Sequence, residues 1–155
     1  MKKLALFSLA FVLLLGVFVF FYRPPIFSGL PYYKSCEFYT SGGFQDFTDY
    51  EKYTFKSVTA ENFKNSKYFT ETTSDDVEEI LLYIDDFEGW VAACGGELEE
   101  NYDFDKSMVS EGDFFYIETK EGQPIGQGTY KKFDNYSVWY FDIGSQTLYY
   151  LHNNI

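Results

Sequence analysis

The sequence predicts an α+β protein in which one amphipathic helix packs on an antiparallel, meander-like sheet, preceded by an N-terminal transmembrane helix. Three observations support this fold class. Residues 4–22 are uncharged and almost wholly apolar. Residues 75–94 carry apolar side chains at helical spacing. After residue 113, short aromatic segments alternate with turn residues, which is typical of consecutive antiparallel strands.

The composition is typical of one globular domain with a strong negative charge. The chain has 155 residues, of which 46% are hydrophobic and 23% aromatic. This excludes a disordered chain, because disordered chains have little apolar surface to bury. All 24 acidic residues follow Arg23, and the nine basic residues there leave a net charge of −15. Such a field repels nucleic acid and anionic membrane surfaces and favours solubility, cations or a basic partner, so no nucleic acid partner is expected.

The N-terminal segment has the length of a membrane span. Lys2 and Lys3 precede the apolar run 4–22, which as a helix would be about 28 Å long and would match the bilayer's hydrocarbon thickness. Bulky aromatic residues end the run where a signal peptidase requires small ones, so residues 1–23 are predicted to remain as a membrane anchor. The N-terminal positive charges keep that end cytoplasmic and place the domain outside, as a single-pass protein. The alternative is a cleaved signal peptide and a secreted domain.

The rest of the chain is divided into a linker and one domain. Two consecutive prolines end the first helix, because proline cannot continue it. Residues 24–35 are interpreted as a linker, and residues 36–155 as an extracytoplasmic α+β domain. Aromatic segments at 36–39 and 53–58 predict the first two strands, and the glycines and polar residues between them, including 45–52, predict a turn.

The two cysteines fit an exported domain. Cys36 and Cys94 are the only cysteines of the chain, and an even number in an oxidising compartment predicts a disulfide between them. Two buried unpaired cysteines are one alternative. A reactive thiol paired with His152, the only histidine, is another.

The strongest predicted element is a helix over residues 75–94. Thr73 or Ser74 can cap its N-terminus, and its acidic first turn suits the helix dipole. Gly95 provides the left-handed stop at its end, whereas Gly89 inside it lowers helix propensity. One face of the helix is apolar and consists of Val77, Ile80, Ile84, Phe87 and Val91.

The acidic side of this helix is expected to be solvated. Glu78, Glu79, Asp85 and Asp86 lie opposite the apolar face, and the helix contains no lysine to pair with them. We therefore expect this side to serve solubility or partner binding.

The C-terminal part predicts a meander with aromatic residues on both faces. Its strands are expected at 114–119, 129–133, 136–141 and 147–152. Because one helix covers only one face, the other face would present Tyr and Trp, which contribute strongly to binding interfaces. The candidate binding residues are Trp139, Tyr140, Tyr149 and Tyr150. The alternative is that segments 24–35 and 59–73 cover this face.

No catalytic, cofactor-binding or metal-binding residue is predicted, and no cofactor. A single histidine and the absence of a C-x-x-C motif argue against a zinc site. The segment that starts with Asp103 and Asp105 resembles the start of a calcium-binding loop, but it lacks the glycine and the glutamate of an EF-hand. We interpret it as a solvated acidic loop. The alternative is an irregular calcium site formed by Asp103, Asp105 and Asp113. Glycine-rich phosphate loops and nucleophile elbows do not occur.

These observations predict a binding or accessory module at the outer face of a membrane. It would be anchored through residues 4–22 and would engage a basic or aromatic-accepting protein partner, without being an enzyme. The alternative is an enzyme that hydrolyses an envelope polymer with paired carboxylates.

Overall fold

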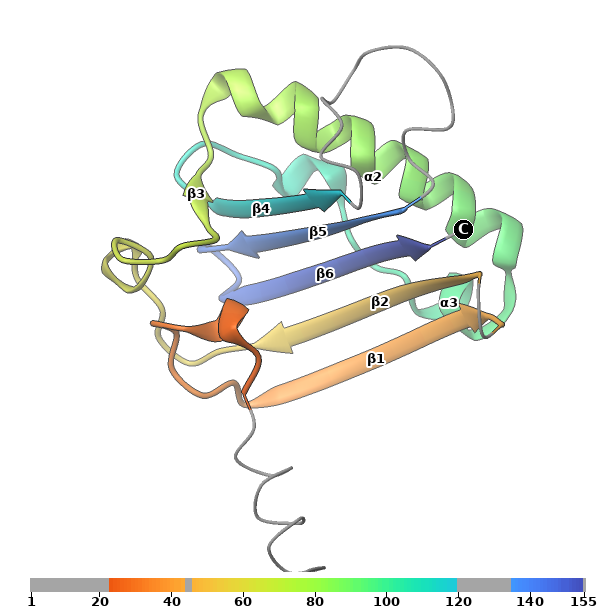
Figure 1. Cartoon of the computed structure of the whole chain (residues 1–155), viewed down its shortest axis with the longest axis horizontal. Coiled ribbons are helices and arrows are strands. Elements are labelled where there is room, and N and C mark those ends of the chain that lie inside the picture. The colour runs from red at the N-terminus through yellow and green to blue at the C-terminus, as the bar shows by residue number, and fades with distance from the viewer. Residues whose placement is uncertain (1–22, 44–45, 120–134, 155) are drawn as a thin grey trace, which may run out of the picture.

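The computed structural model of the chain describes residues 23–43, 46–119 and 135–154. These residues form a six-stranded antiparallel sheet with the strand order β1-β2-β6-β5-β4-β3 (Figure 1). The strands are β1 (Ser35–Gly42), β2 (Phe47–Thr54), β3 (Thr70–Glu71), β4 (Phe114–Thr119), β5 (Asn135–Asp142) and β6 (Thr147–Asn154). The helices are α2 (Ser74–Cys94) and α3 (Gly96–Asn101), with three 3-10 turns, η1 (Pro25–Phe27), η2 (Ala60–Asn62) and η3 (Lys106–Met108). The predicted α+β class, with one main helix on an antiparallel sheet, is confirmed.

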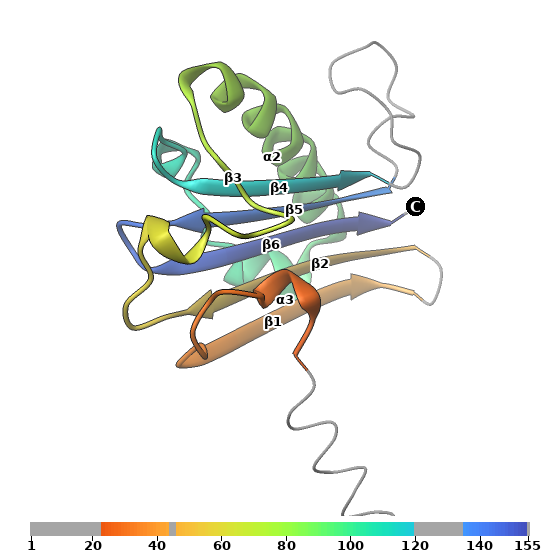
Figure 2. The same cartoon turned by 60° about the vertical axis from the view of Figure 1, so that its left-hand side comes forward.

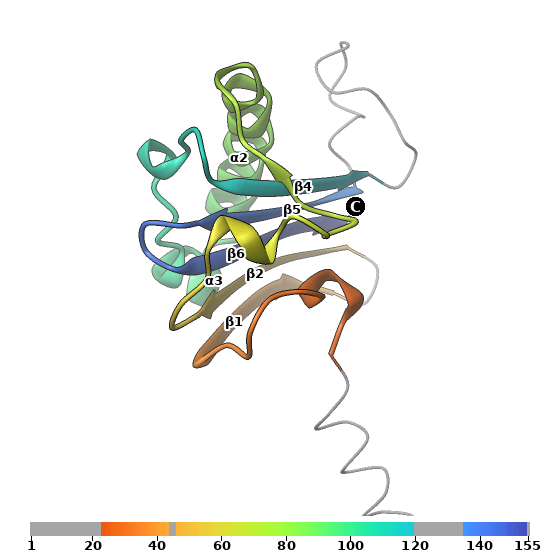
Figure 3. The same ribbon diagram turned by 90° about the vertical axis from the view of Figure 1, so that its left-hand side faces the viewer.

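The sheet lies between two unequal layers. Helices α2 and α3 cover one face, and the segments that contain η1 and η2 lie on the other (Figure 2 and Figure 3). Strands β4, β5 and β6 form the predicted meander. The β1–β2 hairpin, however, pairs through β2 with β6, so the two ends of the domain meet at the centre of the sheet.

The predicted helix is confirmed within one residue of its start. Thr73 is its N-cap and forms a capping box with Asp76, whose carboxylate accepts a hydrogen bond of 2.8 Å from the Thr73 backbone N–H. Gly95 ends it at a φ of +63°, in the left-handed region that glycine adopts without strain. The helix continues through Gly89. Its buried face consists of Ile80, Tyr83, Ile84, Phe87 and Val91.

The strand predictions differ in their success. The predicted strand 114–119 coincides with β4, and 136–141 and 147–152 lie within β5 and β6. The predicted strand 129–133 lies outside the described residues. The prediction of a strand at 53–58 is wrong, because β2 occupies Phe47–Thr54. In strand β2, residues that face the helices alternate with carboxylates. The carboxylates make the segment polar, so its sequence resembles a turn.

The layer opposite the helices has its own small core. Ile26, Phe27 and Leu30 are at most 7% exposed and pack with Phe141 and Leu148 of the sheet. Residues 24–35 therefore pack on the domain, and their interpretation as a linker is wrong. The alternative that segments 24–35 and 59–73 cover this face holds for the half of the sheet where β6 begins.

The predicted span, residues 4–22, lies outside the described residues. Within residues 23–43, 46–119 and 135–154, no helix combines the length and the apolar character that crossing a bilayer requires.

Candidate functional site

In the second half of the sheet face opposite α2, the segments that contain η1 and η2 reach the border, where Phe27 contacts Trp139 and Tyr68 contacts Tyr116. Opposed residues of antiparallel strands point to the same face, so the strand register defines two rows of side chains there. We call these two rows the open face. The first row is Phe38, Glu51, Tyr150, Trp139 and Tyr116, and the second is Thr40, Asp49, His152, Ser137 and Glu118.

Aromatic rings on the open face stack on one another. The Trp139 and Tyr150 ring centroids are 4.0 Å apart, with 29° between the planes. Tyr150 and His152 follow at 5.8 Å and 7°. Trp139 also stacks on Tyr53 and meets the Phe27 ring edge to face, so its neighbours occupy much of the surface of its ring. The open face is therefore unsuited to stacking a sugar ring, which requires an accessible aromatic face.

The charges of three carboxylates on the open face act on the Tyr150 hydroxyl. Burial raises the pKa of Tyr150 to about 12, a hydrogen bond with Ser137 acts against this, and the negative charges of Glu51, Asp49 and Glu118 add to it. The Ser137 hydroxyl lies 3.4 Å from the Tyr150 hydroxyl and 2.9 Å from Nδ1 of His152. Tyr150 and these carboxylates thus belong to one negatively charged patch of the open face.

Glu51 is the unusual member of this patch. Its carboxyl is half-buried, and burial raises its pKa; the hydrogen bond from the Tyr53 hydroxyl lowers the pKa and the nearby Asp49 raises it. Among the described residues, no lysine or arginine forms an ion pair with Glu51, Asp49 or Glu118. The carboxylate of Glu51 is therefore held partly out of water without a basic partner from the described chain.

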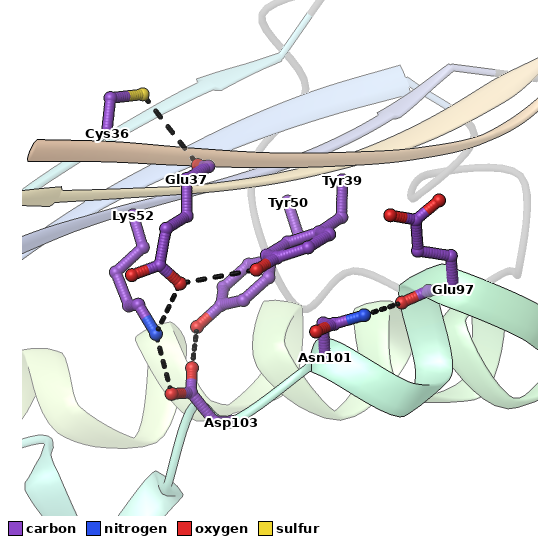
Figure 4. A network of polar contacts seen from close by, with 8 residues as sticks. All are labelled: Cys36, Glu37, Tyr39, Tyr50, Lys52, Glu97, Asn101 and Asp103. Carbon is purple, nitrogen blue, oxygen red and sulfur yellow. Dashed lines mark hydrogen bonds and ion pairs between the residues drawn. The ribbon is translucent and has the colours of Figure 1, made fainter.

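The opposite face contains a polar network in which one lysine pairs with two carboxylates. Lys52 lies 2.7 Å from Asp103 and 3.1 Å from Glu37, and the Tyr50 hydroxyl donates to Asp103 at 2.6 Å (Figure 4). Tyr39 donates to Glu37 in turn. Because each charge in this network has a partner, we interpret it as the attachment of the segment after α3 to the β1–β2 hairpin.

The structure divides the four candidate binding residues between the two faces. Trp139 and Tyr150 lie on the open face and are partly exposed. Tyr140 and Tyr149 face α2 and the loop after it and are 0% and 6% exposed, so they belong to the core and not to a binding surface. The sequence reasoning missed Phe38, which is 55% exposed, and the carboxylates of β2. The alternation of core residues and carboxylates along residues 47–54 was the signal that could have identified them.

The predicted disulfide between Cys36 and Cys94 is contradicted by the structure. Both cysteines are free and exposed, so the alternative of two buried cysteines is also wrong. Cys36 is paired with Tyr53 at one end of the β1–β2 hairpin, whereas the Cys94 thiol lies 3.8 Å from the Thr48 hydroxyl near the other end. The two thiols also lie on opposite faces of the sheet, as Figure 4 shows for Cys36.

The remaining chemical alternatives gain no support. Nδ1 of His152 is 2.9 Å from both the Ser137 hydroxyl and the Tyr136 carbonyl, so its contacts are not with a cysteine. The three aspartates of the considered calcium site have separate roles. Asp103 pairs with Lys52, Asp105 accepts from the Ser107 backbone N–H, and Asp113 accepts from Tyr140, Ser110 and Ile143. No group of three metal ligands occurs in the part of the chain that the structure describes.

The acidic side of α2 also differs from its prediction. Lys106, which follows α3, lies 2.7 Å from Asp85 and 2.8 Å from Glu88. The hydroxyl of Tyr136, a core residue, donates to the Asp86 carboxylate at 2.8 Å. Asp86 is therefore a structural acceptor, and the expectation that this side is solvated is wrong for Asp86; Asp85 is exposed, although Lys106 pairs with it.

Comparison of the chain with protein-family models, curated proteins and solved structures found no match. We take the open face as the candidate site because Glu51 is half-buried there and forms no ion pair with a described lysine or arginine.

Proposed function

We propose that the protein is a membrane-anchored, extracytoplasmic binding module, and that its open face binds a segment of a partner protein rich in lysine or arginine. Glu51 is the observation that carries this proposal. Its ionisation is opposed by burial, and no described basic residue compensates for it. A side chain that weakens the fold when it is charged is expected to be kept for binding, since function and stability often conflict at the same site.

The chemistry of the patch suits an ammonium or guanidinium group. Such a group would form charge-assisted hydrogen bonds with Glu51 and Asp49 and would replace the water that these carboxylates lose. Its alkyl chain would lie along the edges of Trp139 and Tyr150, beside the exposed Phe38. A bound cation would lower the pKa of Glu51, because an opposite charge favours the ionised form.

The charge of the whole chain supports the same partner. The formal net charge is −12, and an overall field of this sign accelerates the encounter with a cationic protein. In this proposal the apolar run 4–22 supplies the anchor, so the partner is one that acts at the outer membrane surface.

The test uses the full chain in detergent and a fluorescent oligolysine peptide, with an oligoglutamate peptide of equal length as the ligand control. We expect the lysine peptide to bind and its affinity to fall with salt. Glu51→Gln should weaken binding about tenfold or more, since it removes a partly desolvated charge. Glu111→Gln is the matched control, because Glu111 is exposed and lies in the turn before β4.

The combined readout separates binding from folding. Glu51→Gln should weaken binding while it raises the melting temperature, so a lost affinity cannot be attributed to a damaged fold. Equal affinities for the Glu51→Gln and Glu111→Gln variants would contradict the proposal.

A hydrolase that acts on an envelope polymer is the second candidate. It is favoured by the position of Glu51 and Asp49 on one face of β2 and by the burial that raises the pKa of Glu51, because glycoside hydrolases use two carboxyl groups in one site and raise the pKa of one of them. Glu51 and Asp49 are two residues apart on one face of β2, so their Cα atoms are about 7 Å apart and both carboxyl groups could act on one substrate. Release of reducing ends from envelope polysaccharide by the wild type, abolished in Glu51→Gln, would favour the enzyme over the binding module.

A further inference from the structure

A second surface of the domain has the opposite charge. Segments 23–35 and 55–69, which cover half of the sheet, contain five basic residues and one acidic residue; we call them the basic layer. The remaining residues after 35 contain five basic and 23 acidic residues. The four lysines of the layer are exposed. The basic residues are Arg23, Lys34, Lys56, Lys64 and Lys67.

The same layer presents two large aromatic side chains to the solvent. Tyr32 is 73% exposed and Tyr33 is 43% exposed. The Arg23 guanidinium lies 5.1 Å from the Tyr32 ring centroid and donates to the carbonyls of Leu30 at 2.7 Å and Pro31 at 2.5 Å. Arg23 therefore holds the loop that carries both tyrosines, of which Tyr32 is the more exposed and Tyr33 also packs against Phe27 and Tyr53.

In the sequence, the apolar run 4–22 directly precedes the basic layer. Tyr22, its last residue, is followed by Arg23, which is fixed to the domain by its bonds to Leu30 and Pro31. No free linker separates the run from the basic layer. If the run spans a bilayer, the layer is held at the bilayer surface.

We propose that the basic layer, with Tyr32 and Tyr33, contacts an anionic lipid surface beside the anchor. Lysines and arginines near a membrane are attracted to anionic headgroups, and tyrosine is enriched at the headgroup level. The acidic remainder of the domain is repelled by the same surface, so the two parts together orient the domain. This inference rests on the membrane anchor of the proposed function and is independent of the cation bound by the open face.

The two free cysteines provide matched reporters for the test. Cys36 lies close to the layer, two residues after Lys34, and Cys94 lies at the other end of the hairpin, on the helix side. The full chain would be labelled with an environment-sensitive fluorophore at Cys36 in a Cys94→Ser variant, and at Cys94 in a Cys36→Ser variant. Each would be reconstituted in vesicles of phosphatidylcholine alone or with phosphatidylglycerol, with a quencher on the lipid headgroups.

We expect headgroup quenching at Cys36 to be at least twofold stronger than at Cys94, and stronger in the vesicles that contain phosphatidylglycerol. The double variant Lys34→Glu with Lys56→Glu should abolish this lipid dependence. Lys106→Glu, which changes a lysine outside the layer, should leave it unchanged. Equal quenching at the two sites, or quenching that ignores lipid charge, would overturn the proposal.

Alkaline carbonate extraction distinguishes failure of the lipid contact from failure of the membrane anchor. A chain that stays in the membrane but shows equal quenching overturns the contact of the layer and leaves the anchor intact. A chain that is released overturns both the anchor and the contact. Binding of oligolysine by the open face is measured separately and is affected by neither result.

Discussion

The two faces of the sheet use the same residue types in different ways. On the helix-covered face, the tyrosines are buried and their hydroxyls donate to carboxylates, as Tyr136 does to Asp86 and Tyr140 to Asp113. On the open face, Trp139 and Tyr150 stack on each other, and the carboxylates around them lack described basic partners. Aromatic content therefore does not distinguish a core from a binding surface. The hydrogen-bond and ion-pair partners of the polar groups distinguish the two, because a buried polar group that serves the fold has its partner within the fold.

The largest expected contrast is in the response to loss of an aromatic ring. Phe87 is 0% exposed under α2, so Phe87→Ala should lower the free energy of unfolding by about 3–5 kcal/mol. Phe38→Ala on the open face should lower it by less than about 1 kcal/mol, since most of that ring is in water. Denaturant unfolding of the full chain in detergent measures both values. Similar losses for the two variants would show that the open face is covered.

A smaller effect is expected from strengthening α2 without changing its core contacts. Gly89 is exposed within the helix, and an added Cβ would meet no atom within 4 Å. Gly89→Ala should raise the free energy of unfolding by about 0.5–1 kcal/mol, because alanine favours the helix. Thermal melting checks this, and oligolysine binding should not change. A lower melting temperature would mean that α2 is kinked or contacted at this position.

The smallest expected effects are opposite pH dependences on the two faces. Burial raises the pKa of Glu51 above its ordinary value of 4.5, so ionisation opposes folding and stability falls as pH rises through this range. Burial also acts against the ionisation of Asp103, but hydrogen bonds from Lys52 and Tyr50 outweigh it and hold the pKa below the ordinary 3.8. The stability that ionised Asp103 contributes is therefore present above the pKa that this residue has in the unfolded chain. It is lost as the pH falls through the lower pKa that Asp103 has in the folded chain.

Two variants measure these dependences. Glu51→Gln should be more stable than the wild type once the pH exceeds the ordinary pKa of 4.5, and equal to it in acid. Asp103→Asn should be less stable at neutral pH, by less than about 1 kcal/mol because this carboxylate is largely exposed, and the difference should vanish in acid. Unfolding measured from pH 3 to 8 tests both, and shifts of the same sign would contradict the contrast between the faces.

Local patterns predicted those elements that have a local cause. The helix was predictable because apolar spacing, an N-cap and a terminal glycine all mark it, and β4 was predictable from a run of aromatic residues between turns. Strand β2 was missed because Asp49 and Glu51 make it polar, although they alternate with Tyr50 in the core. The pairing of β2 with β6 has no local signal, since it joins segments far apart in the chain.

The candidate site shows the same limit. Alternation separates Trp139 from Tyr140 and Tyr149 from Tyr150, but it does not say which set faces the helix. The carboxylates of β2 reach the site only through the β2–β6 register, so no pattern in the sequence placed them beside Tyr150. The disulfide prediction failed because cysteine number carries no information about distance.

The joining of β2 to β6 has a consequence for the order of folding. Thr48 and Asn153, both buried, bond across 105 residues of chain at 3.0 Å. Contacts of such high sequence separation are slow to form, because a long loop must close before they stabilise anything. During synthesis the β1–β2 hairpin can form early, but one edge of β2 remains unpaired until β6 has been made. Docking of this hairpin onto the β4–β5–β6 meander is expected to be the slow step of folding, and the open face comes into existence only when it is complete.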